Sequence, residues 1–225
     1  DVDVRQARTR LNLETCFVVG SVGRLDAVKN FATFVDAAAL VARRREDVAF
    51  VLIGGGPLEE KLRQRVDALG LRDRFRMTGW REDARALLPA FDIFVSTSVR
   101  ETFGNSLVEA ALAGKPVIAP AVDGIPEVVV HEQTGLLLTP TEPLGQRTGP
   151  GAAAIPQRVL VGGELQPPRT LAPQGLAEAI LCLLDQPDLR ARYGESGRQR
   201  AQNLFSMSRY IQDLESAYID LVAGR

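Results

Sequence analysis

Long apolar runs are missing from this sequence of 225 residues, and so is an excess of charge of either sign. A membrane-spanning helix needs ~20 consecutive apolar residues, and no stretch of the sequence comes near that length. Lys and Arg number 27 against 28 Asp and Glu, so no basic field that would attract nucleic acid is expected. We therefore expect a soluble globular protein that has no membrane span and does not bind nucleic acid.

Cysteine and histidine are also scarce. The two cysteines, Cys16 and Cys182, lie far apart in the sequence and neither belongs to a CxxC motif, which argues against a metal site or a disulfide framework. A reducing cytoplasm fits this usage, and the charged opening residues are unlike a signal peptide. The single histidine, His131, falls in a predicted turn, where a surface position is favoured over a role as base or ligand.

The sequence does contain a regular alternation of apolar runs and amphipathic segments. Strands are expected at residues 16–21, 48–53, 74–78, 91–96, 116–120 and 136–138, with helices between them. The run 48–53 is almost wholly apolar, which is typical of a strand buried on both faces of a parallel sheet. Short connections between parallel strands require right-handed crossovers. The fold class is therefore α/β, a doubly wound Rossmann-like parallel sheet of about six strands with helices on both faces and extra C-terminal helices.

The stretch from Ser98 to Glu109 follows one predicted strand and leads into a helix, and it is the first candidate site. Gly104 lets the backbone approach a ligand, and the free amides of the helix's first turn favour an anion. Glu101 and Glu109 would place two carboxylates beside that anion, which suits the hydroxyls of a sugar or ribose. The alternative is that both are solvated helix-start residues, stabilised by only ~0.3–1 kcal/mol each.

The loop after the first strand is the second candidate. Gly23 permits close backbone approach, while Arg24 and Lys29 supply two cations beside a helix start, which suits a diphosphate. Each charge-assisted hydrogen bond contributes ~1.5–3 kcal/mol, compared with ~0.3–2 kcal/mol for a helix terminus alone. The alternative is a pair of surface cations, one of them paired with Asp26.

Two further loops are expected at the same edge of the sheet. Residues 54–57, Gly-Gly-Gly-Pro, lack the spacing of the G-x-G-x-x-G and P-loop motifs, so we interpret them mainly as a tight turn between a strand and a helix. Trp80 and Arg81 follow the third strand, where a ring and exposed backbone groups suit a nucleobase. For Trp80, a plain core position is an equal alternative.

Taken together, the motifs resemble the C-terminal, donor-binding domain of the group 1 retaining glycosyltransferases, which have the GT-B fold. The matching segments, in order, are 23–30, 79–80, 101–109, 114–119, 123–127, 134–137 and 176–218. The resemblance covers nearly the whole chain except residues 139–172. Each motif is weak alone, but their order and spacing are specific.

The resemblance implies a role for each candidate residue. Arg24 and Lys29, beside Gly23, would hold the diphosphate. Glu101 would contact the hydroxyls of the transferred sugar and is the expected catalytic residue, while Glu109 would bind the ribose. The other expected donor-binding residues lie around the base or supply amides to phosphate and sugar: Trp80, Arg81, Thr102, Phe103, Gly104, Asn105 and Ser106.

The resemblance further implies a UDP-, GDP- or ADP-sugar as donor, with no metal and no additional cofactor required. Thr102 and Ser106 depart from the commoner pattern, in which Gly and Pro stand at these positions, so the identity of the donor stays open. The acceptor, a saccharide or a lipid-linked one, would be held by an N-terminal domain that this chain lacks.

We therefore expect part of a larger hexosyltransferase-like enzyme of polysaccharide biosynthesis. Its location would be the cytoplasm, with the full-length enzyme at the membrane periphery. We expect the chain alone to bind its donor without transferring the sugar.

The expected domain organisation is simple. Residues 1–15 are a linker or first segment, and residues 16–225 form a single nucleotide-sugar-binding domain. Residues 140–172 are a long insertion in which Pro and Gly make up 11 of 33 residues, so it orders only by packing on something else. A short strand or hairpin within it is expected at residues 155–161. Because the insertion follows the carboxyl end of the last strand, a place near the donor edge in contact with the acceptor or a partner is one interpretation, and a plain surface loop is the favoured one.

Two other functions stay open on the sequence alone. A sugar-nucleotide epimerase uses a similar two-domain body, and only the fuller match to transferase motifs argues against it. A nucleotide-binding redox domain is less favoured because no G-x-G-x-x-G follows the first strand.

Overall fold

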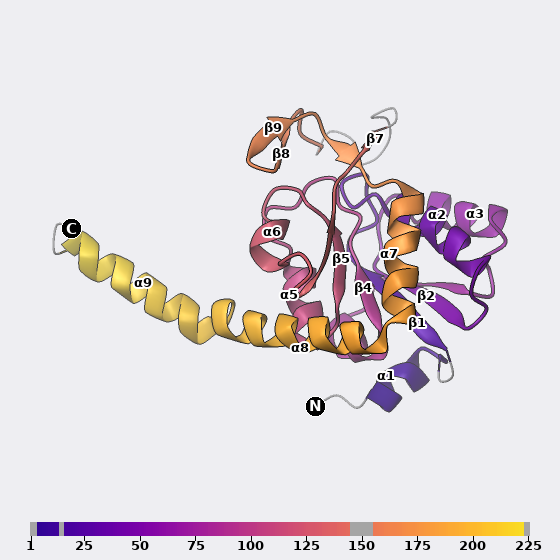
Figure 1. Cartoon of the computed structure of the whole chain (residues 1–225), viewed down its shortest axis with the longest axis horizontal. Coiled ribbons are helices and arrows are strands. Elements are labelled where there is room, and N and C mark those ends of the chain that lie inside the picture. The colour runs from indigo at the N-terminus through magenta and orange to yellow at the C-terminus, as the bar shows by residue number, and fades with distance from the viewer. Residues whose placement is uncertain (1–3, 14–15, 145–154, 223–225) are drawn as a thin grey trace.

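The computed structural model describes residues 4–13, 16–144 and 155–222. Its centre is a six-stranded sheet in the order β3-β2-β1-β4-β5-β6, with every neighbouring pair parallel (Figure 1). The strands are β1 (Phe17–Val22), β2 (Val48–Ile53), β3 (Phe75–Gly79), β4 (Ile93–Val95), β5 (Val117–Pro120) and β6 (Gly135–Leu138). The predicted doubly wound α/β fold is confirmed.

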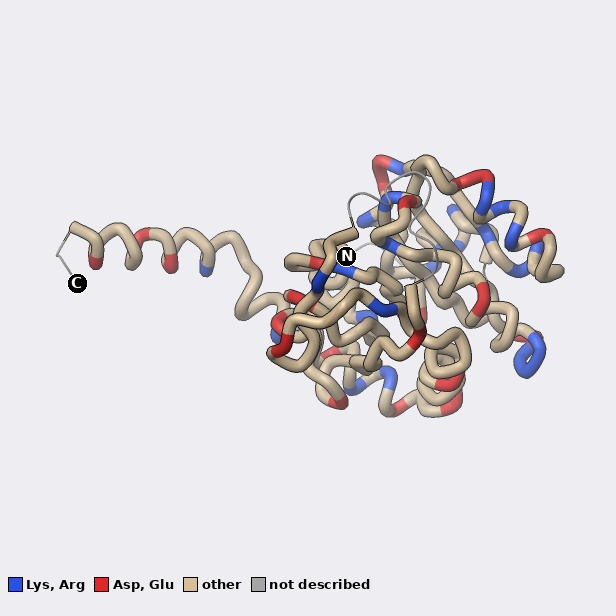
Figure 2. The backbone as a smooth tube through the Cα atoms, turned by 90° about the horizontal axis from the view of Figure 1, so that it is seen from above, with Lys and Arg blue, Asp and Glu red and all other residues tan. Residues whose placement is uncertain are grey.

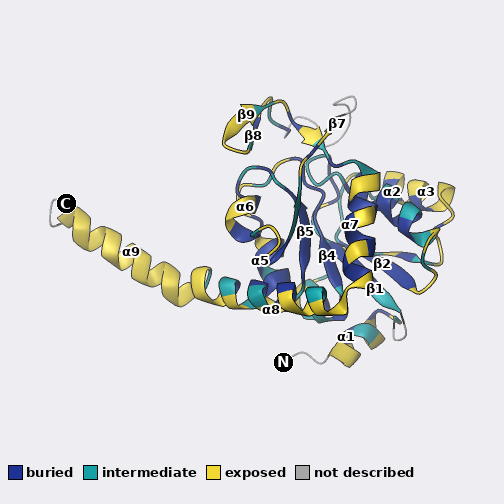
Figure 3. Cartoon of the chain, viewed as in Figure 1, coloured by how far each residue is buried: buried dark blue, intermediate teal, exposed yellow. Residues whose placement is uncertain are grey.

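Helices cover both faces of this sheet, which explains the apolar sequences of its strands (Figure 3). All six residues of β2 are buried, as its continuous apolar run predicts. One face packs against α2 (Phe31–Ala42), α3 (Glu59–Ala68) and α7 (Pro173–Asp185). The other packs against α1 (Val4–Arg10), η1 (Leu88–Ala90), α5 (Asn105–Leu112) and α6 (Ile125–Val128), with α4 (Ala84–Leu87) beside them.

The segment expected to be a linker or first segment contains helix α1, which is docked on the domain. Ala7 and Leu11 are buried, and Arg8 Nη2 lies 2.7 Å from Asp92 Oδ2. The same carboxylate oxygen accepts the N–H of Val18 in β1 at 2.7 Å. Residues 4–11 therefore pack beside the start of the sheet, while the proposed domain boundary at residue 15 stays a prediction.

The insertion is folded where the structure describes it. A stem pairs β7 (Glu142–Pro143) with β10 (Arg169–Thr170), and a hairpin pairs β8 (Val159–Val161) with β9 (Glu164–Gln166). Gly162 and Gly163, at φ 58° and 88°, form the two-residue turn of the hairpin. The hairpin expected within residues 155–161 is therefore present, at residues 159–166, while the choice between a plain surface position and contact with an acceptor or partner is not decided by this pairing. Residues 145–154 of the insertion lie outside the described part.

Two long helices close the chain. Helix α8 (Pro187–Leu204) runs beneath the sheet, and α9 (Met207–Val222) projects away from the domain in both views (Figures 1 and 2). None of the residues of α9 is buried. Its exposed apolar side chains recur at helical spacing: Met207, Tyr210, Ile211, Leu214, Tyr218 and Leu221. Within the described chain, nothing covers this face (Figure 3).

Two features are absent from the described residues. No helix among them is long and apolar enough to cross a membrane. Nor do they contain a group of three or more His, Cys, Asp and Glu side chains arranged to hold a metal ion.

Candidate functional site

The candidate site lies beyond the carboxyl ends of β1 and β4. These strands are neighbours, but the chain leaves β1 toward β2 and leaves β4 toward β5 on the opposite side. Such a reversal of winding direction opens a crevice, where doubly wound sheets bind their ligands. The loop after β1 carries Arg24 and Lys29, and the loop after β4 carries Glu101.

Asp26 organises the loop after β1. Its side chain is 3% exposed, and its Oδ1 accepts the N–H groups of Val28 at 3.0 Å and Lys29 at 3.1 Å. Its Oδ2 accepts Nε of Arg24 at 2.6 Å. Arg24 thus pairs with Asp26, as the surface-cation alternative expects, but the buried carboxylate also orients the guanidinium, whose side chain is 71% exposed.

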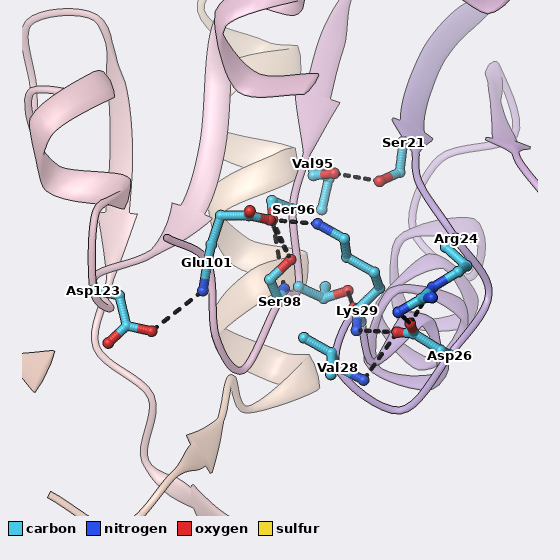
Figure 4. Close-up of polar contacts among 11 residues, drawn as sticks. Ser21, Arg24, Asp26, Val28, Lys29, Val95, Ser96, Ser98, Glu101 and Asp123 are labelled. Atoms are coloured by element: carbon cyan, nitrogen blue, oxygen red, sulfur yellow. Dashed lines mark hydrogen bonds and ion pairs between the residues drawn. The ribbon is translucent and has the colours of Figure 1, made fainter. Parts of the chain in front are cut away.

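Lys29 and Glu101 meet between the two loops (Figure 4). Lys29 Nζ forms an ion pair with Oε2 of Glu101, and Ser98 Oγ lies 3.5 Å from the same oxygen. Thr97 Oγ1 donates to the carbonyl of Lys29 at 2.8 Å, which ties the loops together. The side chain of Lys29 is 24% exposed and that of Glu101 is 16% exposed. Glu101 is therefore not the solvated helix-start residue of the alternative interpretation.

The loop of Glu101 leads directly into α5. Gly104 precedes the helix at φ 90°, and a Cβ there would lie 2.7 Å from Cδ1 of Leu107. The position therefore favours glycine for its own backbone conformation, while close approach of a ligand to this loop stays a prediction. Asn105 and Ser106 begin the helix, so their N–H groups belong to the turn that has no intrahelical acceptors.

The other two residues of this loop are exposed, but their side chains have different surroundings. Phe103 packs edge-on against Phe205, at the end of α8, with ring centroids 5.3 Å apart. Its ring is thus used in packing, whereas its backbone remains part of the loop. Thr102 is exposed.

Glu109 lies on α5 and has a different cationic partner from Glu101. Its Oε1 is 2.7 Å from Nη2 of Arg85 on α4, and the pair is partly exposed. The structure therefore places the two predicted carboxylates in separate ion pairs rather than in one cluster. Sequence reasoning missed Arg85, because the pairing joins residues 24 positions apart.

A cavity of about 450 Å³ lies between the loops that follow β1, β2 and β3. Gly23, Arg24, Trp80 and Arg81 of the predicted set line it. Trp80 is 76% exposed, so the alternative that places it in the core is wrong. The volume falls within the range of ~300–1,000 Å³ that is usual for small-molecule sites.

Arg81 is held in place by Asp83. Its Nε and Nη2 donate to the two carboxylate oxygens at 2.6 and 2.7 Å. These hydrogen bonds lower the pKa of Asp83, so the carboxylate that pairs with Arg81 stays ionised near neutral pH. Both cations of the cavity wall are thus paired with a carboxylate, and the side chain of Arg24 is the more exposed of the two.

Gly54 and Gly55 line the same cavity, which the sequence interpretation did not anticipate. Gly54 has φ 148°, and a Cβ on it would lie 1.9 Å from the carbonyl oxygen of Gly23. The N–H of Gly23 donates to the carbonyl of Ile53 at 3.0 Å. The tight-turn interpretation is therefore confirmed, and this contact between backbones shapes one side of the cavity.

Comparison with known proteins gives two kinds of match. A sequence profile of the family described as Glycosyl transferases group 1 matches residues 16–146. The lipopolysaccharide core biosynthesis glycosyltransferase LpsD of Rhizobium meliloti (strain 1021) is 35% identical over 215 residues, which cover 94% of this chain and 52% of LpsD.

Solved structures agree. Anabaena Alr3699/HepE, crystallised in complex with UDP and glucose, matches with a TM-score of 0.77 and 26% identity, covering 96% of this chain and 52% of that one. The C-terminal domain of the group 1 family protein LpcC of Francisella tularensis shares the fold, with a TM-score of 0.71, 21% identity and coverage of 91% of this chain and 94% of that domain.

The chain spans about half the length of the curated relatives that it matches most fully. The region matched by the family profile includes the loops of Arg24, Lys29 and Glu101. The resemblance deduced from the motifs is thereby confirmed, and this chain belongs to the group 1 glycosyltransferase family.

Proposed function

We propose that this chain is the C-terminal, donor-binding domain of a retaining glycosyltransferase and that it binds a nucleoside diphosphate sugar. The observation that carries the proposal is the ion pair of Lys29 with Glu101 at the reversal of winding, together with Arg24, which belongs to the loop of Lys29 and lines the cavity of about 450 Å³. The cations suit the diphosphate, the carboxylate suits sugar hydroxyls, and the cavity suits a nucleoside. The UDP and glucose in the HepE crystal support this assignment.

The diphosphate would contact Arg24, Lys29 and the amides at the start of α5. Asp26 holds Arg24 in position, so little side-chain freedom would be lost on binding. The amides of residues 103–106 add partial positive charge at a helix start. The nucleobase would occupy the cavity against Trp80 and the backbone around Arg81. Ribose hydroxyls would hydrogen-bond to Glu109.

Glu101 would act on the transferred sugar. A carboxylate that accepts a hydrogen bond from a sugar hydroxyl gains strength as positive charge develops at the anomeric carbon. Such an interaction lowers the barrier more than it tightens ground-state binding. As the bond to the leaving diphosphate breaks, Arg24 and Lys29 would stabilise the negative charge that the diphosphate takes up.

The acceptor, a saccharide or a lipid-linked saccharide, would bind to an N-terminal domain that is not part of this chain. Two observations support a second domain: the relatives are about twice as long, and the apolar face of α9 has no partner in the described chain. We propose that α9 packs on that domain. The name of LpsD supports a role in polysaccharide biosynthesis, which we place in the cytoplasm.

Neither of the other functions is favoured by the matches. Three relatives that match over more than nine-tenths of this chain, LpsD among them, are named as transferases, which argues against an epimerase. A redox domain would need a dinucleotide fingerprint after β1, where the sequence reads Gly23-Arg24-Leu25-Asp26.

A thermal-shift panel tests the proposal on this chain. UDP, GDP, ADP and their sugars are added at rising concentration, with NAD and FAD for the redox alternative. A ligand at about 100 times its Kd stabilises the native state by ~2.7 kcal/mol, which raises Tm by several degrees. We expect one nucleoside diphosphate and its sugars to raise Tm, with UDP first. A shift with dinucleotides alone, or with no ligand at all, contradicts the proposal.

The panel includes two variants. Lys29→Ala should lose most of the shift, because it removes a cation of the diphosphate site. Lys61→Ala is the matched control, since Lys61 is an exposed lysine on α3, away from the cavity.

A further inference from the structure

Asp123 joins the loop of Glu101 to the β8–β9 hairpin. Its Oδ2 accepts the N–H of Glu101 at 3.3 Å, and its Oδ1 accepts the N–H of Leu160 at 2.9 Å. The N–H of Asp123 donates to the carbonyl of Leu160 at 2.8 Å. In Figure 4, Asp123 reaches Glu101 from the side opposite Lys29. One side chain thus bridges two segments that are about 60 positions apart in the chain.

The backbone at this position is unusual for a residue with a side chain. Asp123 has φ 44°, in the left-handed region that favours glycine and that aspartate tolerates better than most residues. Glycine would adopt this conformation with less strain but would supply no carboxylate. Asp123 combines a strained backbone with two hydrogen bonds that its carboxylate accepts, a combination that is typical of functional positions.

The neighbouring residue fixes the distance between the loops. The N–H of Gly124 donates to the carbonyl of Glu101 at 3.0 Å. A Cβ on Gly124 would lie 2.0 Å from the carbonyl oxygen of Thr102, so the two backbones are in direct contact. Both the N–H and the carbonyl of Glu101 are therefore bound by residues 123 and 124.

The hairpin is a fixed support for Asp123. Val159 is 1% exposed, and Val161 packs against the core on the α5 and α6 face of the sheet. Leu160 stands between them and presents its backbone N–H and carbonyl to Asp123. The hairpin belongs to residues 139–172, the part of the chain that the resemblance to the family does not cover.

We propose that Asp123 is a positioning residue for Glu101, held in place by the hairpin. This inference rests on the proposed function, because it takes Glu101 as the group that contacts the transferred sugar. When Lys29 turns from Glu101 to the diphosphate, the contacts of residues 123 and 124 continue to hold the backbone of Glu101. The insertion would then contribute to sugar transfer without lining the nucleoside cavity.

Amide hydrogen exchange on this chain tests the structural link. In Asp123→Gly, the N–H groups of Glu101 and Leu160 should exchange at least ~10-fold faster than in the unaltered chain, since each loses its acceptor. Gly at position 123 relieves the left-handed strain, so the variant should keep its fold and its UDP affinity. Asp123→Asn keeps one carbonyl oxygen as acceptor, so the exchange rates of these amides should lie between those of Asp123→Gly and those of the unaltered chain. Unchanged exchange at both amides overturns the inference.

The functional arm uses the enzyme that contains both domains and measures release of UDP from UDP-glucose with water as acceptor. Asp123→Gly should lower kcat ~10-fold with KM within about twofold, because a displaced carboxylate weakens transition-state stabilisation. A purely structural role would instead lower Tm and affect binding of UDP as well. The inference is overturned if the fall in kcat is accompanied by a matching fall in Tm, or if kcat does not fall at all.

A double variant separates this inference from the function on which it rests. If Asp123 acts through Glu101, then Asp123→Gly should cost little further activity in a Glu101→Gln background. Additive losses overturn the positioning role while leaving the proposed function intact. An unaffected kcat in Glu101→Gln alone overturns both.

The hairpin has its own variant and a matched control. Gly162→Val strains the left-handed turn at φ 58° and should loosen Leu160, reducing kcat in the same sense as Asp123→Gly. Gly70→Val introduces comparable strain at φ 69° in an open turn after α3, and should leave kcat unchanged. Equal effects of the two variants would contradict a specific role for the hairpin.

Discussion

Lys29 and Glu101 form an ion pair that bridges the loops after β1 and β4. A diphosphate in the proposed site would attract the same ammonium group, so phosphate binding and release of the carboxylate become linked. Ser98 lies beside Glu101 and offers a hydroxyl to the released carboxylate. This arrangement makes the charge on Lys29 important for binding and the carboxylate of Glu101 important for the chemical step.

Arg24→Ala and Lys29→Ala should each weaken the binding of UDP by about tenfold or more. Loss of ~1.4 kcal/mol is sufficient, and a charge-assisted hydrogen bond contributes ~1.5–3 kcal/mol. Isothermal titration calorimetry on this chain measures the change. Arg43→Ala and Lys61→Ala alter exposed cations elsewhere and should leave the affinity unchanged. Unchanged affinity in both site variants would remove these two side chains from the diphosphate site.

Glu101→Gln should reduce kcat by roughly ten- to a thousandfold in the two-domain enzyme, with UDP affinity within about twofold. The amide keeps the size of the side chain but has no negative charge to oppose the positive charge that develops at the anomeric carbon. That range corresponds to ~1.4–4 kcal/mol of transition-state stabilisation. Release of UDP from UDP-glucose provides the rate, and calorimetry provides the affinity.

Glu109→Gln should behave differently, because this carboxylate is proposed to bind ribose. It should weaken the binding of UDP itself, about threefold to tenfold, and should affect plain diphosphate and sugar nucleotide alike. Arg85→Ala is an informative companion, since it removes the cation that pairs with Glu109 and leaves the carboxylate in place. Intact kcat in Glu101→Gln together with intact UDP affinity in Glu109→Gln would refute the assigned roles of the two carboxylates.

Local sequence patterns were sufficient to predict the fold. Most strands of the sheet are short apolar runs, and β2 was predicted at its observed limits. The hairpin was less predictable, because residues 159–166 lie in a Gly- and Pro-rich stretch and are ordered partly by the packing of Val159. That packing depends on tertiary structure, which the periodicity of apolar residues in the local sequence does not indicate.

The candidate site was predictable in its loops but not in its contacts. Gly23, Arg24 and Lys29 stand out because cations and glycine follow a strand and precede a helix. Asp26 could also have been found, since an aspartate that precedes free amides by two or three residues commonly accepts their N–H groups. The partners of Glu101 and Glu109 could not, because those pairs join separate loops and helices.

Gly54→Ala should destabilise the domain by at least ~2 kcal/mol. Its Cβ would overlap the carbonyl oxygen of Gly23, and the conformation at φ 148° is strained for any L-residue. Gly175→Ala is the matched control. This glycine lies in α7 with open space around it, so alanine should stabilise by ~0.5–1 kcal/mol. Urea unfolding at one pH measures both, and equal values for the two variants would contradict the predicted contact.

Lys115 should make stability rise with pH in alkaline solution. Burial lowers its pKa below the ordinary value of 10.5, although its Nζ donates to the carbonyl of Pro89 at 2.9 Å. Between the lowered folded pKa and 10.5, the unfolded chain binds more protons than the folded one, so the free energy of unfolding increases with pH. The Lys115→Met variant should lack this increase.

Urea unfolding of the unaltered chain and of Lys115→Met at several pH values up to 10.5 gives the difference between their free energies of unfolding. Subtracting the variant removes the contributions of other groups that titrate in this range, such as the Cys16 thiol, whose pKa is raised by partial burial. A difference that is constant over this range would contradict the lowered pKa of Lys115.

Helix α9 has 16 residues and no buried side chain, so no tertiary packing within the described chain offsets its loss of conformational entropy. Isolated helices of about this length are only marginally stable in water. We therefore expect this segment to interconvert between helix and coil in the chain alone, with amide exchange close to that of an unfolded peptide. Association with an N-terminal domain would then be a coupled folding and binding step, weakened by the entropy of ordering α9, and any variant that raises helix propensity on its polar face should tighten that association.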